Sequence, residues 1–553
     1  MQQYGANSMI DENEDPRIAI LNALGLSLAS KRRDAVAARA ISGIEDEWIG
    51  DEEHYQGYDD ANRGEFVNTA SKPLANGSTS SVKSDVTGST VFPNITQPYC
   101  DAVSARIGDM LLPTDDRNFA VEATPIPDMG LDQFPDEATP QSGMAPEAPQ
   151  QQANPMLQMP NGSMVSAQEA KAAFEKMKAE ASRKAGKAEQ RIDDWLTECQ
   201  SNAEMRKVID DAVKLGSGVI KGPVPVNRKS SKWQRGDDGV ATLTIIEEIK
   251  PASFRVDPWN LFPDPACGES IHNGAYIFER DFLTGKKIQA LRGLPGYIDA
   301  QIEKCLEEGP KSLAESDGKT ALYNRSTKDQ FEIWYIYVDI KAEELEAAGC
   351  DCGDSKKSFP AILTMVNDHV IRASLNPMDS GEFPYDVIPF KRRPGMPWGM
   401  GLGRQLRTPQ RIVVGATRRL MDNAGLGSGP QIVVRRGVEP ENGIWEISPL
   451  KIWIESEDSG GQATSPVTSV VIPMLQEELT NIIQFGMKMA EDVTGMPMLL
   501  QGQQGKAPDT VGGMTILNNN ANAVLRRVAR LFDSSITEPH ISRYYAWLME
   551  YGE

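Results

Sequence analysis

The chain has 553 residues, 40% of them hydrophobic, which allows a real core and roughly two to four domains, or one large elaborated domain. Its 78 acidic and 57 basic residues give a formal net charge of −21 at pH 7. Affinity for phosphates needs cationic surface, so this charge argues against a general nucleic-acid binder. It still allows a protein that must touch DNA without adhering to it.

The six cysteines are scattered, and Cys350 and Cys352 form the only close pair. Without a second pair at ligand spacing, we expect free thiols in a reducing cytosol and not a metal site. The N-terminus lacks a basic stretch followed by an apolar run, so no signal peptide is expected. No window approaches the roughly 20 apolar residues of a membrane span, and the sequence predicts a soluble protein.

Apolar residues at helical spacing and strong helix formers predict helix from residue 16 to 58. Trp48 and Tyr55 fall on one face of it, where two aromatic core anchors are favoured over a ligand cage. A further helix is predicted around Val103, Ile107, Met110 and Leu111.

The composition changes at residues 122–166, which are rich in Pro, Gln, Met and Gly. This composition predicts a disordered, surface-exposed insertion. Helical periodicity then resumes and ends at Gly216 and Gly218. Between Val219 and Phe390, runs of β-branched and aromatic residues predict strands, with two short helices among them. This block is therefore predicted to be mixed α+β.

Residues 391–419 invert the local charge, with eight Lys or Arg residues and no acid. Thr408 and Pro409 predict a helix start, with Pro at the first helical position, and the helix runs to about Ala424. Two interpretations remain open for its cations. They form a solvated face paired with acid from this chain or a neighbour, or they contact phosphate or an acidic partner.

Residues 430–471 predict a compact strand-rich unit, after which Pro473 suits the first position of a helix that Gly495 ends. The apolar stripe of this helix consists of Leu475, Leu479, Ile482, Ile483, Gly486, Met489, Ala490 and Val493. A second helix places on one face Met514, Leu517, Ala521, Val524, Leu525, Val528, Leu531 and Phe532. The two helices present a polar loop whose core has no charge before Lys506.

The glycines of 399–403 lack the spacing of a dinucleotide-binding fingerprint and better suit a loop in which backbone passes closely. A phosphate-binding loop at Lys506 fails, because Ala507 follows the lysine and a helix precedes it. No nucleophile elbow occurs, and the dispersed histidines are His54, His272, His369 and His540. The sequence therefore predicts no catalytic residue, no metal site and no cofactor.

The order of these parts resembles the portal (head-to-tail connector) proteins of tailed bacteriophages, most of all those of short-tailed phages. The resemblance covers most of the chain from about residue 16, apart from 122–166. It rests on the helix with Trp48 and Tyr55 and on the phrases PNITQPYCDAVSARIGDMLLPTDDRNF, FRVDPWNLFPDP, GMGLGRQLRTPQRIVVGATRRLMD and EDVTGMPMLLQGQQGKAPDTVGGM.

The resemblance implies an α+β portal-type subunit that assembles as a ring, a dodecamer, around a DNA channel at one capsid vertex. Its implied parts are an N-terminal helical part of the wing (1–121), the insertion (122–166), an α+β wing (167–402), a stem helix (403–424), a clip (425–471), a second stem helix (472–494), a tunnel loop (495–510) and channel or wing helices (511–553), kinked at Pro539, with the crown short or missing. The implied function is genome packaging, retention and ejection without enzymatic activity.

The implied partners are further copies of the chain, double-stranded DNA, the terminase packaging motor, a head-to-tail adaptor, and the major capsid and scaffolding proteins, with no membrane. The implied locations are the virion, at the capsid vertex, and the host cytoplasm during assembly. The resemblance assigns DNA contact in the tunnel loop to Gln501, Gln503, Gln504 and Lys506. The basic run itself, and not the resemblance, makes candidates for contact with DNA or a partner of Arg404, Arg407, Arg411, Arg418 and Arg419.

Two alternatives stay open: another viral structural component of tail or capsid, and an enzyme of the packaging motor. The motor would need a Walker loop and acidic metal ligands, and the missing Walker loop argues against it.

Overall fold

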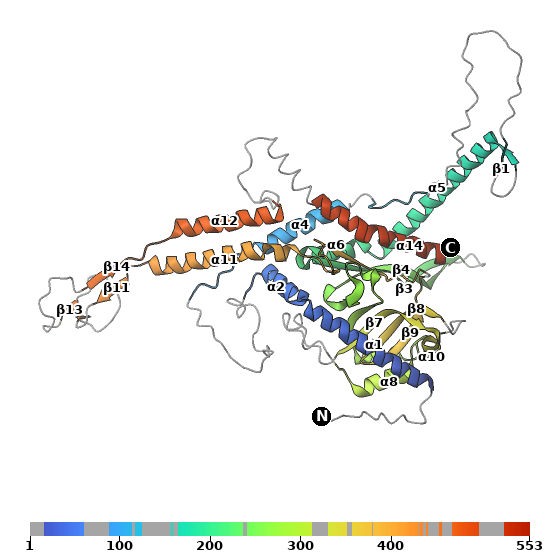
Figure 1. The fold of residues 1–553 in the computed structure, drawn as a ribbon, viewed down its shortest axis with the longest axis horizontal. Helices are drawn as coiled ribbons and strands as arrows, with labels where there is room; N and C mark the ends of the chain where they lie inside the picture. The colour runs from blue at the N-terminus through green and yellow to red at the C-terminus, as the bar shows by residue number, and fades with distance from the viewer. Residues whose placement is uncertain are drawn as a thin grey trace, which may run out of the picture.

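A pair of long helices projects from a mixed α+β body in the computed structural model of the chain (Figure 1). The residues that the structure describes are 16–59, 88–112, 117–123, 156–158, 164–235, 241–311, 330–350, 357–378, 380–429, 431–434, 438–440, 453–455, 467–496 and 525–552. Within these ranges, no helix is both long and apolar enough to cross a membrane.

The N-terminal helices α1 (Pro16–Ile41) and α2 (Ile44–Gln56) confirm the helix predicted from residue 16, with a break at Gly43 in the left-handed region. Trp48 of α2 is fully buried, and its ring lies 5.2 Å from those of both Trp259 and Trp398. The predicted core role of Trp48 is thus confirmed. Tyr55 is half-buried and donates a hydrogen bond to the Asp101 carboxylate at 2.7 Å.

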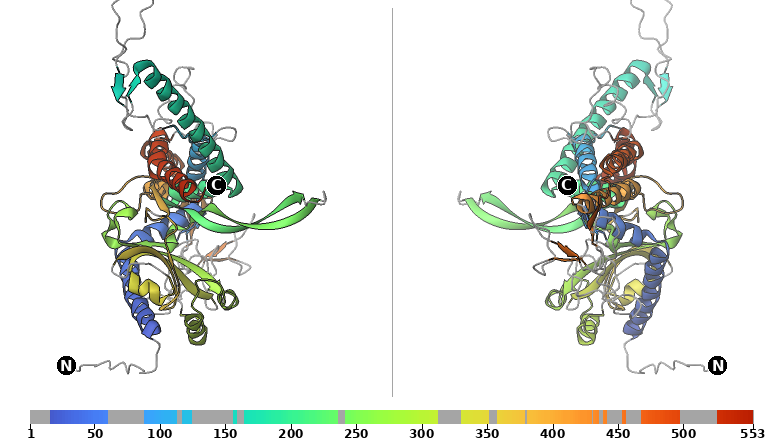
Figure 2. Two further views of the ribbon diagram at one scale, coloured as in Figure 1. Left: turned by 90° about the vertical axis from the view of Figure 1, so that its right-hand side faces the viewer. Right: turned by 90° about the vertical axis from the view of Figure 1, so that its left-hand side faces the viewer.

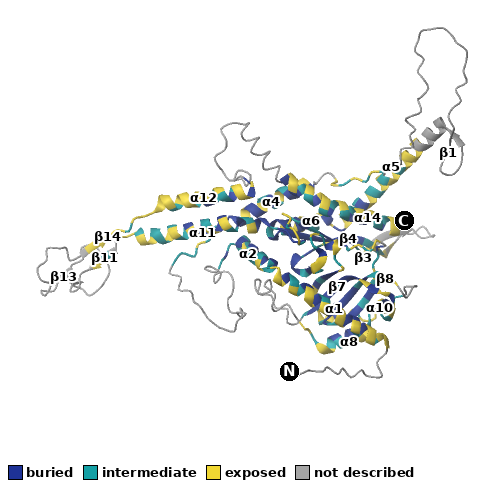
Figure 3. Cartoon of the chain, in the orientation of Figure 1, coloured by how far each residue is buried: buried dark blue, intermediate teal, exposed yellow. Residues whose placement is uncertain are grey.

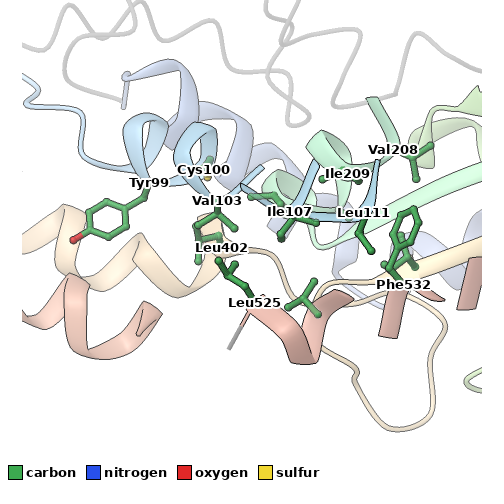
Figure 4. Packing of buried hydrophobic residues seen from close by; sticks show 14 of the residues in the cluster. Tyr99, Cys100, Val103, Ile107, Leu111, Val208, Ile209, Leu402, Leu525 and Phe532 are labelled. Carbon is green, nitrogen blue, oxygen red and sulfur yellow. The ribbon is translucent and has the colours of Figure 1, made fainter. Parts of the chain in front are cut away.

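The largest core lies where α4 (Thr96–Leu111), α6 (Ser201–Leu215), α11 (Leu402–Gly427) and the C-terminal helical segment meet. Figure 4 shows Val103 and Ile107 of α4 packed with Leu402 and Leu525, which come from the other end of the chain. Val103, Ile107 and Leu111 are buried as predicted, whereas Met110 is 43% exposed. Helix α5 (Ala167–Glu198) packs only its C-terminal part, through Ile192 and Trp195, and its other end projects from the body (Figure 1).

The body contains two main antiparallel sheets, which confirm the predicted α+β block. The first has the order β10-β3-β4, with β3 (Ser217–Arg235), β4 (Ala241–Val256) and β10 (Tyr385–Pro389). The second has the order β5-β6-β7-β8-β9, with β5 (Leu261–Pro263), β6 (Tyr276–Thr284), β7 (Gln330–Lys341), β8 (Ser358–Val366) and β9 (His369–Leu375).

Short helices pack against the second sheet. They are α7 (Gly285–Gln289), α8 (Asp299–Glu308) and α10 (Ala342–Ala347), with 3-10 turns at Pro258–Asn260, Pro265–Cys267 and Ile271–Asn273. The predicted insertion 122–166 lies mostly outside the described residues. Its described part includes two paired strands, β1 (Met156–Gln158) and β2 (Met164–Ser166).

The glycines near residue 400 form a backbone crossing. A Cβ atom on Gly399 would lie 2.3 Å from the carbonyl oxygen of Gly216, and one on Gly401 would lie 2.4 Å from that of Lys214. Both distances are too short for any side chain, so these positions need glycine. The prediction of a loop with close backbone passage is confirmed.

Helix α11 begins at Leu402, so the predicted start at Thr408 and Pro409 is wrong. Pro409 lies inside the helix, where a proline removes one backbone hydrogen bond and costs about 3 kcal/mol. The turn before it forms nevertheless, because Leu402 and Leu406 are buried in the main core at about 1.5–3 kcal/mol each. Tertiary packing outweighs the local signal here.

Helix α12 (Gln476–Thr494) begins three residues later than Pro473, so the predicted first position of that proline is also wrong. The Asn423 side chain of α11 accepts a hydrogen bond from the Leu475 amide at 2.9 Å and donates one to the Pro473 carbonyl at 3.2 Å. These bonds hold residues 473–475 against α11. The predicted end is confirmed, since Gly495 adopts the left-handed conformation that closes the helix.

The chain continues from α11 into short strands and returns through them to α12. These strands are β11 (Gln431–Val434), β12 (Val438–Pro440), β13 (Trp453–Glu455) and β14 (Val467–Val470), paired as β11-β14 and β12-β13. They lie at the far tip of the helix pair (Figure 1). The strand-rich character predicted for 430–471 is confirmed where the structure describes it.

The C-terminal segment is helical from residue 525 and passes through a π-helical turn, Asp533–Thr537, into α14 (Glu538–Tyr551). Leu525, Val528 and Phe532 are buried in the main core, as the predicted apolar face requires. The remaining members of that face before residue 525 lie outside the described residues. Pro539 follows the π turn directly, at the second position of α14.

Candidate functional site

The helix pair α11–α12 is held together by a close approach at Gly486. A Cβ atom there would lie 2.8 Å from Cγ2 of Val413 and 3.2 Å from Cγ2 of Ile412. A β-branched side chain cannot easily move away, so the glycine sets the spacing of the two helices. The pair therefore forms one rod that carries the strands at its tip.

The outer face of this rod exposes apolar side chains that no residue described in the structure covers. On α12, Phe485 is 62% exposed, and Leu475, Ile482 and Val493 are each more than 40% exposed. Met421 and Leu426 add to the exposed apolar surface on α11. Figure 3 shows exposed residues along most of α12.

The stripe predicted for α12 therefore splits into two sides. Ile483, Gly486 and Ala490 face the body, whereas Leu475, Ile482 and Val493 face outward. Contiguous apolar surface of this kind marks a site of protein contact. The periodicity of the sequence could show that the helix is amphipathic. It could not show that one apolar side packs on the body whereas another is exposed.

The predicted cations of α11 divide into paired and exposed residues. Arg407 forms an ion pair with the buried Asp51 at 2.8 Å and also donates to the Glu47 carbonyl. Arg418 makes two hydrogen bonds of 2.9 Å to the Asp59 carboxylate. These arginines join α11 to α2 and to the residues that follow it.

The other three predicted arginines are more open to solvent. Arg404 is exposed and lies 3.4 Å from the Glu47 carboxylate, a long ion pair of little strength at the surface. Arg411 and Arg419 are exposed, and neither has an ion pair with any residue that the structure describes. They are the predicted cations of α11 best placed to meet an external anion.

The predicted tunnel-loop residues Gln501, Gln503, Gln504 and Lys506 lie outside the described residues. The chain on either side is fixed, because Met496 and Leu525 are both buried in the main core. The two described residues that flank this segment thus lie in the same core, and the tunnel loop and its contacts with DNA stay predictions.

Gln410 of α11 has a role that the sequence did not signal. Its Oε1 atom accepts hydrogen bonds from the amides of Ile95 and Thr96 at 2.9 and 3.2 Å and from the Thr96 hydroxyl at 3.1 Å. Its Nε2 atom donates to the Pro93 carbonyl at 2.7 Å. The N-terminus of α4 has no cap from its own N-cap side chain, so Gln410 replaces that cap from a helix more than 300 residues away.

A buried polar network joins α14 to the first sheet. Asp386 of β10 pairs with Arg543, and its carboxylate lies 3.5 Å from Nδ1 of His540. On its other side, Nε2 of His540 lies 2.9 Å from the hydroxyl of Ser253, which also lies 2.7 Å from the Tyr544 hydroxyl. Sequence reasoning missed this network, because its members are dispersed along the chain and match no motif.

Burial and charge shift the pKa values of this network. Although burial opposes the charge of Asp386, Arg543 and the two histidines His272 and His540 hold the pKa of that carboxyl well below its usual range. Burial lowers the pKa of His540 below 6.5, despite the neighbouring Asp386. At neutral pH the network therefore pairs an ionised Asp386 with Arg543 and contains a neutral histidine.

The order Ser253, His540, Asp386 resembles the arrangement of a hydrolytic triad. All three side chains are buried, however, so no substrate could reach the serine hydroxyl in this conformation. The network fastens α14 to β3, β4 and β10, because breaking a buried ion pair costs several kcal/mol.

The remaining polar groups offer no competing chemistry within the described part of the chain. No cluster of three or more His, Cys, Asp or Glu residues there could hold a metal ion. The described cysteines are free thiols, as predicted: Cys100, Cys199, Cys267, Cys305 and Cys350.

Comparison with known families decides between the alternatives that the sequence left open. The family model described as phage SU10 portal protein matches residues 256–553, more than half of the chain. The chain belongs to this portal protein family. No curated protein sequence matches it.

The match begins at the last residue of β4 and contains the second sheet, the helix pair α11–α12 and α14. The resemblance to portal proteins of short-tailed phages is thereby confirmed. The exposed apolar surface on α12 lies inside the matched region, as do the exposed cations Arg411 and Arg419 of α11.

Proposed function

We propose that this portal protein is a non-enzymatic structural subunit of a closed ring, a dodecamer, that encloses a channel for double-stranded DNA at one capsid vertex. The genome would be packaged, retained and ejected through this channel. The match to the portal family over residues 256–553 carries the proposal. The uncovered apolar face of α12 supports it, because a ring of identical subunits provides the missing cover.

The proposed roles of the parts follow the architecture. The body, from α5 to β10 with the N-terminal helices, is the wing, and α11 and α12 are the two stem helices. The strands within 425–471 are the clip, which docks the terminase packaging motor and the head-to-tail adaptor. Residues 495–510 are the tunnel loop. Their position between two ends fixed in one core supports this assignment.

The proposed DNA contacts are few and weak. The tunnel loop offers Lys506 and the three glutamines 501, 503 and 504, and α11 offers Arg411 and Arg419. A net charge of −21 per subunit keeps the rest of the ring from binding phosphates tightly. Sparse cations and exchangeable amide hydrogen bonds let DNA slide, since each firm phosphate contact would resist movement.

The further proposed partners are the major capsid and scaffolding proteins, which build the shell around the ring. The proposed locations are the virion vertex and, during assembly, the host cytoplasm.

The mass and shape of the purified protein test the ring directly. We expect native mass spectrometry and electron microscopy to show closed rings whose mass is a multiple of the 60.6 kDa subunit. A protein that stays at the subunit mass at high concentration, or that forms open filaments, would contradict the proposal. ATP hydrolysis by the purified rings would contradict the non-enzymatic role.

A further inference from the structure

The strands β3 and β4 form a long hairpin that leaves the body (Figure 2). Strand β10 pairs with β3 only from Ser217 to Lys221, and a bulge follows before Val224 pairs with Ala252. Beyond that point, neither outer edge of the hairpin has a partner among the strands that the structure describes. We call residues 224–235 and 241–252 the hairpin arm.

The contacts of the hairpin arm with the body end close to its base. The Lys250 ammonium group lies 2.8 Å from the Glu198 carboxylate, at the end of α5, and Arg228 donates to the Glu198 carbonyl. One step farther out, the ion pair between Lys229 and Glu247 joins the two strands of the arm to each other. The base is anchored, and farther out no hydrogen bond or ion pair joins the arm to the body among the residues that the structure describes.

The hairpin arm exposes apolar side chains on one face, from its anchored base outward. Leu243, Ile245 and Ile249 are 54%, 68% and 71% exposed. They are two and four residues apart along β4, and because side chains alternate between the two faces of a strand, all three lie on the same face. A two-stranded hairpin is at best marginally stable in water without cover on its apolar face. Open edges with apolar residues also invite pairing with another chain.

We infer that the hairpin arm of one subunit packs on the body of the next copy in the ring; this inference rests on the proposed ring. Charge favours this occupant. The hairpin arm carries five cations and two acids, whereas each copy as a whole has a net charge of −21. An arm on one side of a subunit and a different receiving surface on its neighbour form a head-to-tail contact, which is the kind that closes rings.

The hairpin arm is thus a second link between subunits, separate from the apolar face of α12. Salt would weaken the ion pairs between the arm and the neighbouring copy. It would not weaken the contribution from burying Leu243, Ile245 and Ile249. The two links lie on different elements, so each can be weakened without touching the other.

The double variant Ile245→Glu/Ile249→Glu tests the inference. We expect the concentration at which half of the subunits are in rings to rise on the order of tenfold or more, because two apolar side chains lose their cover. The matched control is Ile41→Glu/Leu294→Glu, which places the same charges at two other exposed apolar positions. The control is expected to assemble like the wild type.

A shortened arm guards against local misfolding of the charged variant. Replacing residues 231–245 by Asn-Gly joins Ser230 and Ile246, which are cross-strand partners, through a favoured two-residue turn. Circular dichroism checks that each variant is folded before its mass distribution is measured. We expect the shortened variant to assemble as poorly as the charged one.

The outcomes separate this inference from the proposed function. Wild-type rings with unchanged assembly of both arm variants would overturn the role of the arm and leave the ring intact. Wild-type protein that never forms rings would overturn the proposed function itself. Arm variants that form normal rings but lose DNA or another component would also count against a contact between copies.

Discussion

At the scale of single residues, long-range polar contacts fix the position of the helices that carry the proposed channel. Gln410 caps α4 from α11, and Arg407 ties α11 to Asp51 of α2. These bonds fix the N-terminal half of α11 to the body. Its C-terminal half projects from the body together with α12 (Figure 1). None of these bonds could be predicted from local sequence, since each joins residues more than 300 positions apart.

The buried network around His540 predicts a response to acid. Burial lowers the pKa of His540 below 6.5, so the unfolded chain takes up a proton in a pH range where the folded chain does not. This part of the stability is complete above pH 6.5 and is lost as the pH falls below it, by at most about 2 kcal/mol at pH 5. Asp386 does not contribute in this range, because its carboxyl stays ionised.

Hydrogen–deuterium exchange of peptides from α14, corrected for the intrinsic effect of pH, measures this response. We expect protection of α14 to fall between pH 7 and pH 5 in the wild type and to change much less in His540→Gln. Peptides from α6, which has no histidine, serve as the internal control. Equal losses in the wild type and the variant would show that His540 is not the sensor.

At the scale of elements, the sequence predicted most helices and strands but not all of their starts. Helices α1, α2, α4, α5 and α6 were found as expected from apolar spacing and strong helix formers. Pro409 and Pro473 predicted helix starts at positions where no helix begins. Buried leucines make α11 begin before Pro409, and Asn423 holds residues 473–475 outside α12. Local signals fail where a contact from a distant element outweighs them.

The glycines of the helix pair give a matched test of this packing. Gly486 of α12 meets Val413 and Ile412, whereas Gly415 of α11 has nothing within 4 Å of its virtual Cβ atom. Both Gly→Ala substitutions gain about 1 kcal/mol of helix propensity, but only Gly486→Ala adds a clash of about 1–3 kcal/mol.

We therefore expect Gly415→Ala to raise the thermal midpoint slightly and Gly486→Ala to lower it. Scanning calorimetry of unassembled subunits measures both midpoints under one condition. A rise for both variants would mean that the two helices can separate at no cost, and Gly486 would then not set their spacing.

At the scale of the whole molecule, the architecture separates a body, a projecting helix pair and a hairpin arm. The sequence predicted the α+β body and the helix pair, because both rest on periodicity. It did not predict the hairpin arm, because the outer residues of β3, from 227 to 235, are mostly polar and lack the β-branched run typical of a strand. Nor could it divide the arginines of α11 into paired and exposed residues, since that division depends on which acids α2 and the residues after it supply.

The proposed channel yields a test at the scale of the assembly. One Lys506 per subunit is a weak contact, but a ring repeats it in every copy around the DNA. We expect Lys506→Ala to leave ring formation intact and to alter the amount of DNA packaged or retained in the particle.

The control for Lys506→Ala is Lys311→Ala, whose cation pairs with Glu308 on the surface of the body, away from both proposed links between subunits. Electron microscopy of the rings and quantification of encapsidated DNA are the two measurements. Unchanged packaging and retention in Lys506→Ala would remove the lysine from the proposed set of DNA contacts.

The π-helical turn at Asp533–Thr537 sets the rotation, about the helix axis, of the residues after it relative to those before it. Phe532 and Tyr544 are twelve positions apart and both fully buried, although they belong to different cores. In an unbroken α-helix they would point about 120° apart, and the extra residue of the π turn reduces this to roughly 20°. The number of residues in this turn is therefore fixed, and deleting one of them would rotate one core out of register with the other.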